Sequence, residues 1–159
     1  MTPQIKSIPP KKLIGSRLNM SYANNWTFKL WNGFMPRRKE IANAVGTDMF
    51  SLQIYPEGFH AHFSPETEFE KWAAVEVTDF DAHPEGMETL ELAGGQYAVF
   101  SYTGTPEEAV PFYSFIFNDW LPSSGYVLDN RPHFEVLGEK YKNGSPESEE
   151  EVWVPVKER

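Results

Sequence analysis

The sequence contains no cysteine among its 159 residues. Without thiols there can be no disulfide, no thiolate ligand for a metal ion and no cysteine nucleophile. Long apolar runs are absent too, so no segment resembles the roughly 20-residue apolar stretch of a membrane-spanning helix. Residues 1–14 carry charges and prolines where a signal peptide would have an apolar segment. We therefore expect a soluble, cytoplasmic protein without a membrane partner.

Basic residues are few, with 14 Lys and Arg against 23 Asp and Glu, which gives a formal net charge of −9. Phosphate backbones are bound by basic faces, and the sequence has neither such a face nor a basic recognition helix. We therefore expect no direct nucleic-acid binding. An acidic surface instead raises the local concentration of cationic ligands, although it can also serve solubility alone.

Familiar catalytic and cofactor motifs are missing as well. The chain has no Gly-x-Ser-x-Gly, no phosphate-binding loop and no dinucleotide fingerprint, so no cofactor is expected. His60 and His62 are two residues apart and would share a strand face, a spacing that metal sites use. Because no third ligand stands near them, we expect no metal site.

Aromatic residues, in contrast, are plentiful, with 12 Phe, 7 Tyr and 5 Trp making up 15% of the chain. Their rings supply flat, rigid apolar surface, and their faces attract cations. Many of them must belong to the core. The excess nevertheless indicates a pocket that holds an apolar or cationic small molecule.

The order of predicted elements repeats once along the chain. Each half reads strand–helix–strand–strand, and a polar linker at 79–88 separates the halves. The second helix has a clear start at Thr105, with Pro at the first helical position and Glu108 at the third. The predicted helices are 25–35 and 106–121, and the predicted strands are 13–20, 50–55, 69–77, 96–102, 133–137 and 152–156.

This repeat predicts an α+β fold in a single domain, 1–159, built from pseudo-repeats at about 1–82 and 88–159. Two such units would form a pseudo-twofold antiparallel sheet with two main helices on it. A central groove on the pseudo-twofold axis would be a natural ligand site.

Three segments in the second half carry a resemblance to a known family. They are Leu92-Ala93-Gly94-Gly95-Gln96-Tyr97-Ala98-Val99-Phe100, Pro132-His133-Phe134-Glu135-Val136-Leu137 and Val152-Trp153-Val154-Pro155-Val156. In this order they resemble strands of the GyrI-like small-molecule-binding family. That family includes the effector-binding domains of AraC-type and MerR-type regulators. The present chain resembles such a domain standing alone, without a helix-turn-helix.

The resemblance implies a duplicated fold and lipophilic, often cationic, ligands. It implies that Glu135 is the counter-charge in the pocket and that Trp153 stacks on the ligand. Leu137 stands where the family motif usually has Tyr, so a hydroxyl group is lost there.

The residues themselves support a special position for Glu135. Strand alternation places it opposite in direction to Phe134 and Val136, on one face with Leu137. A carboxylate buried there would protonate or recruit a cation, whereas at the sheet surface it would be an ordinary exposed Glu. Further rings could line a pocket or simply fill the core; these are Trp31, Trp72, Phe112 and Trp120.

Three functions are consistent with this pattern. The leading hypothesis is a module that binds or sequesters a small lipophilic, cationic molecule. A hydrolase could use the same pocket, with Glu135 as general base and the Tyr113 hydroxyl beside it. A third hypothesis is a protein partner such as DNA gyrase, which the family name implies for some members.

Overall fold

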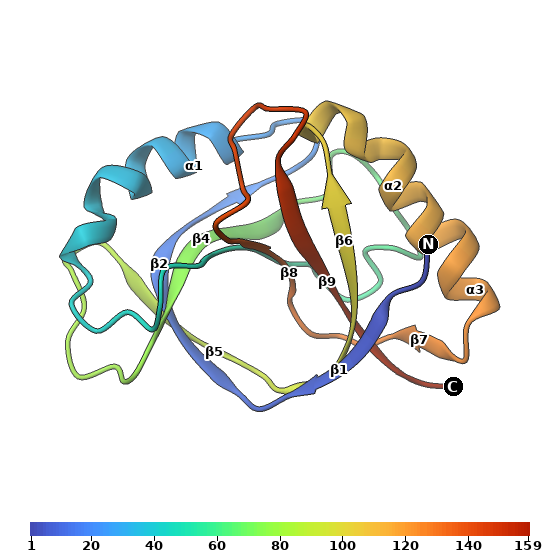
Figure 1. Ribbon diagram of the computed structural model, residues 1–159, viewed down its shortest axis with the longest axis horizontal. Coiled ribbons are helices and arrows are strands. Elements are labelled where there is room, and N and C mark those ends of the chain that lie inside the picture. The colour runs from blue at the N-terminus through green and yellow to red at the C-terminus, as the bar shows by residue number, and fades with distance from the viewer.

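The computed structural model describes residues 1–159 and contains nine strands, all paired antiparallel. Eight of them follow the order β1-β6-β9-β8-β3-β4-β2-β5, and β7 pairs with β9. Two helical segments lie above the central strands (Figure 1). The strands are β1 (Gln4–Ile8), β2 (Lys11–Met20), β3 (Met49–Ile54), β4 (Phe69–Val77), β5 (Glu88–Leu92), β6 (Gly95–Thr103), β7 (Tyr126–Leu128), β8 (His133–Leu137) and β9 (Glu149–Glu158).

Both predicted helices are present. The first is α1 (Thr27–Phe34), followed by a 3₁₀ segment from Met35 to Glu40. The second begins at Thr105 with the expected capping box to Glu108. It continues through 106–109, α2 (Val110–Ser114), a π-helical stretch at 115–120 and α3 (Leu121–Ser123). None of these helices has the length and apolar character needed to cross a bilayer.

The strand predictions were right in the interior of the sheet and wrong at its margins. Strand β4 has the predicted bounds. The predicted strand 96–102 corresponds to β6, and β5, which a break at Ala93 and Gly94 separates from it, was not predicted. Strands β1 and β7 were not predicted either. Neither strand contains a fully buried residue, so neither needs the alternation of apolar and polar side chains by which a strand is predicted.

The register of the sheet repeats in the two halves. Leu52 of β3 and Phe134 of β8 face each other where the halves meet. Leu52 also faces Trp72 of β4, and Phe134 faces Trp153 of β9. The two halves are therefore equivalent residue by residue around this pair, which confirms the predicted duplicated α+β fold. The repeat boundaries at about 1–82 and 88–159 stay a prediction.

The edge strands are exchanged between the halves. Strand β1 pairs with β6 of the second half, and β5 pairs with β2 of the first half. The β1–β2 and β5–β6 connections cross at Gly94, where a Cβ atom would lie 2.5 Å from the Ile8 carbonyl oxygen and 2.9 Å from the Pro10 nitrogen. Figure 1 shows this crossing at the end of the molecule farthest from the helices. A side chain of any size is excluded there.

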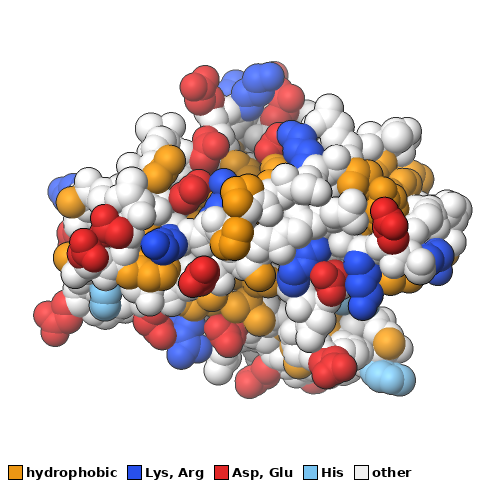
Figure 2. All heavy atoms as spheres, turned by 90° about the horizontal axis from the view of Figure 1, so that it is seen from below, with side chains coloured by type: hydrophobic (Ala, Val, Ile, Leu, Met, Phe, Trp, Pro, Cys, Tyr) orange, Lys and Arg blue, Asp and Glu red, His pale blue; other side chains and the backbone are white.

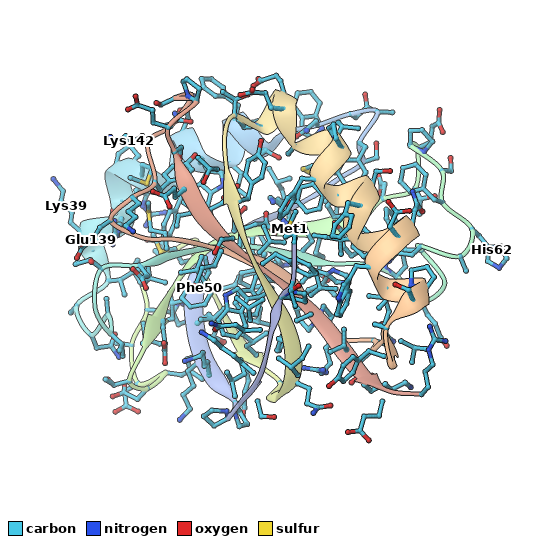
Figure 3. The ribbon with its side chains drawn as sticks, turned by 45° about the vertical axis from the view of Figure 1, so that its right-hand side comes forward. Met1, Lys39, Phe50, His62, Glu139 and Lys142 are labelled. Carbon is cyan, nitrogen blue, oxygen red and sulfur yellow. The ribbon has the colours of Figure 1, made fainter.

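The sheet buries both of its faces. On the helix face, α1 packs against Ile14, Ala73 and Val75, and the 106–123 helix packs against β6 and β9. The opposite face, called here the far face, has its own core, with Phe50 in the interior of the molecule (Figure 3). Its buried members are Leu13, Phe50, Leu52, Trp72, Ala74, Leu92, Tyr97, Val99, Phe134 and Trp153.

The surface on the side away from the helices does not gather its charge by sign. Seen from the side away from the helices, acidic and basic side chains are interspersed, with hydrophobic side chains showing between them (Figure 2). This surface alone therefore does not mark a site. The unusual charges lie inside, on the helix face of the sheet.

Candidate functional site

Glu135 lies on the helix face of β8, opposite Ser51 of β3. It is partly buried, and its carboxylate accepts a hydrogen bond of 3.2 Å from the Gln53 amide. It forms no ion pair. Burial raises the pKa of Glu135, and the charge of Lys71 and the bond from Gln53 offset this only in part. The position therefore disfavours an isolated negative charge and favours a proton or a bound cation.

Two further charged groups share this environment, and neither was predicted from the sequence. The Lys71 side chain on β4 is only 6% exposed, and burial lowers its pKa while Glu135 and Glu150 raise it. Glu150 on β9 has a pKa raised to about 7, by burial first and by repulsion from Glu135 second. Each lies two residues from a core residue of the same strand, Ala73 on β4 and Val152 on β9, and therefore on the same face. This spacing is the feature of the sequence that could have indicated their burial.

Three tyrosines surround the acidic centre. Tyr113 comes from α2, while Tyr22 and Tyr55 follow β2 and β3. The hydroxyls of Tyr22 and Tyr55 are 2.6 Å apart. Burial is the main cause that raises the pKa of all three phenols, and Glu135 adds to it, so they keep their protons at neutral pH. Tyr113 was predicted from the sequence; Tyr22 and Tyr55 were not.

A stack of rings continues from the tyrosines towards the second helix. The His60 ring lies between Phe117, at 5.0 Å between centroids, and His133, at 5.1 Å, and Tyr55 contacts both histidines edge-on. The expectation that His60 and His62 share a strand face is wrong, because residues 57–62 form turns. His62 is exposed at the margin of the molecule (Figure 3).

We expect this stack to make the fold sensitive to acid. Burial, and then the charges of His60 and Arg131, lower the pKa of His133 from 6.5 to about 3. Between these values the unfolded chain takes up a proton that the folded chain excludes, so stability is present above the unfolded pKa and is lost as the pH falls towards the folded one. The loss is about 1.4 kcal/mol per pH unit. His133→Phe keeps a ring without a titration. Between about pH 7 and about pH 5, the free energy of unfolding of this variant should therefore fall by about 2 kcal/mol less than that of wild type. Urea unfolding at the two pH values measures the difference.

The comparison between variants is needed because Glu135 and Glu150 act in the opposite direction. Their raised pKa values stabilise the fold at lower pH, and this contribution is the same in wild type and variant. The exposed His62 serves as the matched control, and His62→Phe should lose stability in parallel with wild type. If the stability of His133→Phe falls with pH in parallel with that of wild type, the acid sensitivity does not come from His133.

Trp153 does not lie beside Glu135. The residue opposite Glu135 on β9 is Val152, so Trp153 points to the far face. There it stacks on Phe134 at 5.2 Å between centroids. Its placement in one pocket with Glu135 is therefore corrected. The neighbouring Val152 and Val154 point to the helix face instead and pack under the second helix.

The other predicted rings also lie in cores. Trp72 occupies the far-face core, Phe112 and Trp120 pack between the second helix and β6, and Trp31 packs with Phe34 beneath α1. Leu137 is buried on the same strand face as Glu135. Among the predicted residues, the structure thus brings together Glu135, Leu137 and Tyr113, and their contact with a ligand stays a prediction.

Two surface hollows are present, and the first shares Tyr55 with this centre. One, of about 280 Å³, is lined by residues at the ends of β3 and β4, including Tyr55 and Glu70. The other, of about 430 Å³, lies between the 40–43 and 79–84 segments. Neither is lined by Glu135, so neither corresponds to the central groove predicted from the sequence.

The duplicated sheet, with two helices over a centre of carboxylates and tyrosines, defines a class of small-molecule-binding domain. The family model of the GyrI-like small molecule binding domain matches residues 1–157. The chain belongs to the GyrI-like family.

Relatives and solved structures agree with this membership. The transcriptional regulator BrlR of Pseudomonas aeruginosa is 25% identical over 157 residues, which is 98% of this chain and 56% of that protein. The chain spans about half the length of the curated relatives that it matches. The structure of SAV2435 bound to tetraphenylphosphonium superposes with a TM-score of 0.70 at 20% identity, covering 99% of this chain and 94% of that one. A hydrolase encoded by lin2189 from Listeria innocua superposes with a TM-score of 0.61 at 12% identity, covering 98% and 92%.

Proposed function

We propose that this domain binds lipophilic organic cations at the centre of its helix face, with Glu135 as the counter-charge. The observation that carries the proposal is a partly buried carboxylate that lacks an ion-pair partner and has a neutral amide as its hydrogen-bond donor. A cation would supply the missing charge, and the attraction is strong where water is excluded.

The surroundings favour an aromatic cation in particular. Tyr22, Tyr55 and Tyr113 lie within electrostatic range of Glu135, and a cation that contacts the face of a tyrosine ring gains about 0.5–2 kcal/mol. Glu150 adds a second carboxylate within electrostatic range of Glu135. The tetraphenylphosphonium complex of SAV2435 supports the choice of such a ligand as the probe.

Calorimetric titration with tetraphenylphosphonium tests the proposal. Glu135→Gln keeps the shape and the hydrogen-bonding capacity of the side chain and removes its charge. It should weaken binding of the cation by about 1–3 kcal/mol, as expected for a charge-assisted contact. Triphenylphosphine oxide has a similar aromatic body without net charge, and its binding should hardly change. Binding of the cation should also weaken as the pH falls, because a protonated Glu135 no longer attracts it.

The matched control for total charge is Glu91→Gln, at an exposed position of β5. It should leave both ligands unaffected, since exposed charges at a distance are screened. Equal weakening of the cation and the neutral compound by Glu135→Gln would make Glu135 structural. Absence of any binding of the cation by wild type at millimolar concentration would refute the function.

A second candidate function is hydrolysis at the same centre. Its specific support is the buried Tyr113 hydroxyl within electrostatic range of Glu135, together with the fold shared with the Listeria innocua hydrolase. A carboxylate with a raised pKa suits general-base work, and a protonated phenol can donate a hydrogen bond to a developing negative charge. Turnover of an activated aryl ester that is lost in both Glu135→Gln and Tyr113→Phe would support hydrolysis; unchanged turnover in both would exclude this pair.

A further inference from the structure

Lys71 is a buried residue whose ammonium group has no partner and keeps a small accessible area. Its side chain is 94% buried by accessible area, being only 6% exposed. It takes part in no ion pair and in none of the side-chain hydrogen bonds of the molecule, although 43 such bonds are formed elsewhere. Ionised groups are costly to bury unless they are paired, so an unpaired one calls for an explanation.

The sheet holds Lys71 on the face of Glu135 but apart from it. Lys71 on β4 faces Gln53 on β3, and Gln53 donates its amide hydrogen to Glu135 on β8. On β8, Gln53 faces His133, and Glu135 lies two residues further along that strand. The two charged residues are thus separated by two strand spacings, about 10 Å, and by an offset of two residues along the strands. A neutral amide lies between them, and it is already engaged by the carboxylate.

This arrangement differs from that of an internal counter-charge. A lysine that neutralised Glu135 would contact its carboxylate, as Lys11 contacts Glu76 at 3.4 Å elsewhere in the sheet. Here the ammonium of Lys71 and the carboxylate of Glu135 both remain available, at separate points of one apolar, tyrosine-walled centre. Glu150 lies within electrostatic range of both.

We propose that the ligand of this domain is a zwitterion, whose cationic group is held by Glu135 and whose anionic group, a carboxylate, sulfonate or phosphate, is held by Lys71. This inference rests on the proposed function and narrows it. A rigid apolar body between the two charges would contact the tyrosine rings, and each buried charge would gain the partner that the protein does not supply.

Two styrylpyridinium dyes that differ only in the group on the ring nitrogen provide the test. One carries a propyl group and is a cation; the other carries a sulfopropyl group and is a zwitterion at every working pH. We expect wild type to bind the zwitterion roughly tenfold more tightly, the size of one charge-assisted contact. Lys71→Met should lower the affinity for the zwitterion roughly tenfold to a hundredfold without lowering the affinity for the cation. Lys71→Arg should keep the preference.

The exposed Lys157 of β9 gives the matched control for total charge, and Lys157→Met should change neither dye. Lys71→Gln serves as a second neutral variant if Lys71→Met fails to fold. A preference of wild type for the cation, or tighter binding of both dyes by Lys71→Met, would overturn the proposal and make Lys71 a competitor of the ligand.

The two proposals fail in distinguishable ways. If tetraphenylphosphonium and the propyl dye bind through Glu135 but the sulfopropyl dye binds more weakly, the cation site stands and the zwitterion proposal falls. If no cation and no dye binds to wild type, both proposals fall together.

Discussion

Gly94→Ala is expected to lower the free energy of unfolding by about 3 kcal/mol, the upper end of what added atoms cost in a packed interior. The new methyl group would sit 2.5 Å from the Ile8 carbonyl oxygen and 2.9 Å from the backbone of Pro9 and Pro10. These are all backbone atoms, so no side chain can move aside. The β1–β2 connection itself would have to shift, and the pairing of β1 with β6 would be strained. Urea unfolding measures the loss, which should also lower Tm by several degrees.

Gly33→Ala is the matched control for this prediction. Gly33 lies inside α1, and a Cβ atom there would meet nothing within 4 Å. Alanine favours a helix interior over glycine by about 0.5–1 kcal/mol, so this variant should be slightly more stable than wild type. Equal stability of the Gly94→Ala and Gly33→Ala variants would show that the crossing of the two connections can accommodate a methyl group, and would contradict the prediction.

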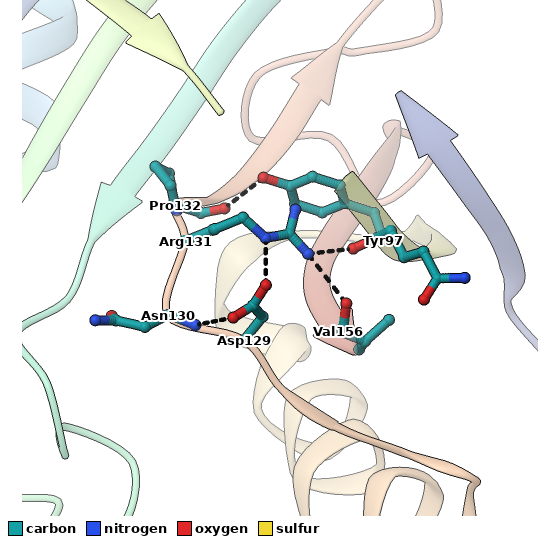
Figure 4. A network of polar contacts seen from close by, with 7 residues as sticks. Tyr97, Asp129, Asn130, Arg131, Pro132 and Val156 are labelled. Atoms are coloured by element: carbon teal, nitrogen blue, oxygen red, sulfur yellow. Dashed lines mark hydrogen bonds and ion pairs between the residues drawn. The ribbon is translucent and has the colours of Figure 1, made fainter. Parts of the chain in front are cut away.

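Arg131→Met should cost about 3 kcal/mol of stability, the lower end for breaking a buried ion pair, because the Asp129 side chain is itself 32% exposed. The guanidinium binds the Asp129 carboxylate at 2.7 Å and the carbonyl oxygens of Gln96 and Val156 at 2.6 and 3.0 Å (Figure 4). It also lies 4.6 Å from the centroid of the Tyr97 ring. Removing it leaves one carboxylate without its partner and two carbonyl groups short of a donor, at the point where β6, β9 and the segment before β8 meet.

An exposed arginine with similar bonds provides the comparison. Arg37 binds the Glu40 carboxylate at 2.9 Å and the Glu85 carbonyl oxygen at 2.6 Å, but at the surface. Arg37→Met should therefore cost much less stability than Arg131→Met, because exposed ion pairs contribute little. Thermal and urea unfolding of both variants decide the matter. Similar losses in the two would mean that burial adds nothing to the Arg131 network.

Local signals in the sequence were sufficient for the elements that the core requires. The capping box at Thr105 and the apolar stripe of α1 located both helices, and strand β4 was placed to the residue. The edge strand β1 was missed because its side chains alternate too weakly in polarity to mark a strand. The pairing of β1 with β6 depends on contacts between distant segments, which no local pattern contains.

The site was predictable only in part, for a related reason. Alternation placed Glu135 and Leu137 on one face of β8 correctly. The same rule could not say which face of a strand buried on both sides meets the helices, and so Trp153 was assigned to the wrong side. Lys71 and Glu150 were overlooked because charged residues within strands are usually exposed. Their burial follows from two helices and neighbouring strands that close over them together.

The exchange of edge strands between the halves also governs the order in which the protein can assemble. Gln4 pairs with Val99, so β1 leaves the ribosome long before β6, its pairing partner, has been made. Pairings across such long sequence separations form slowly, and an unpaired strand is open to association with other chains. Strand β1 is mostly polar and carries Lys6, and both features disfavour the association of an unpaired strand with other chains. The two structural repeats therefore form a single unit in folding.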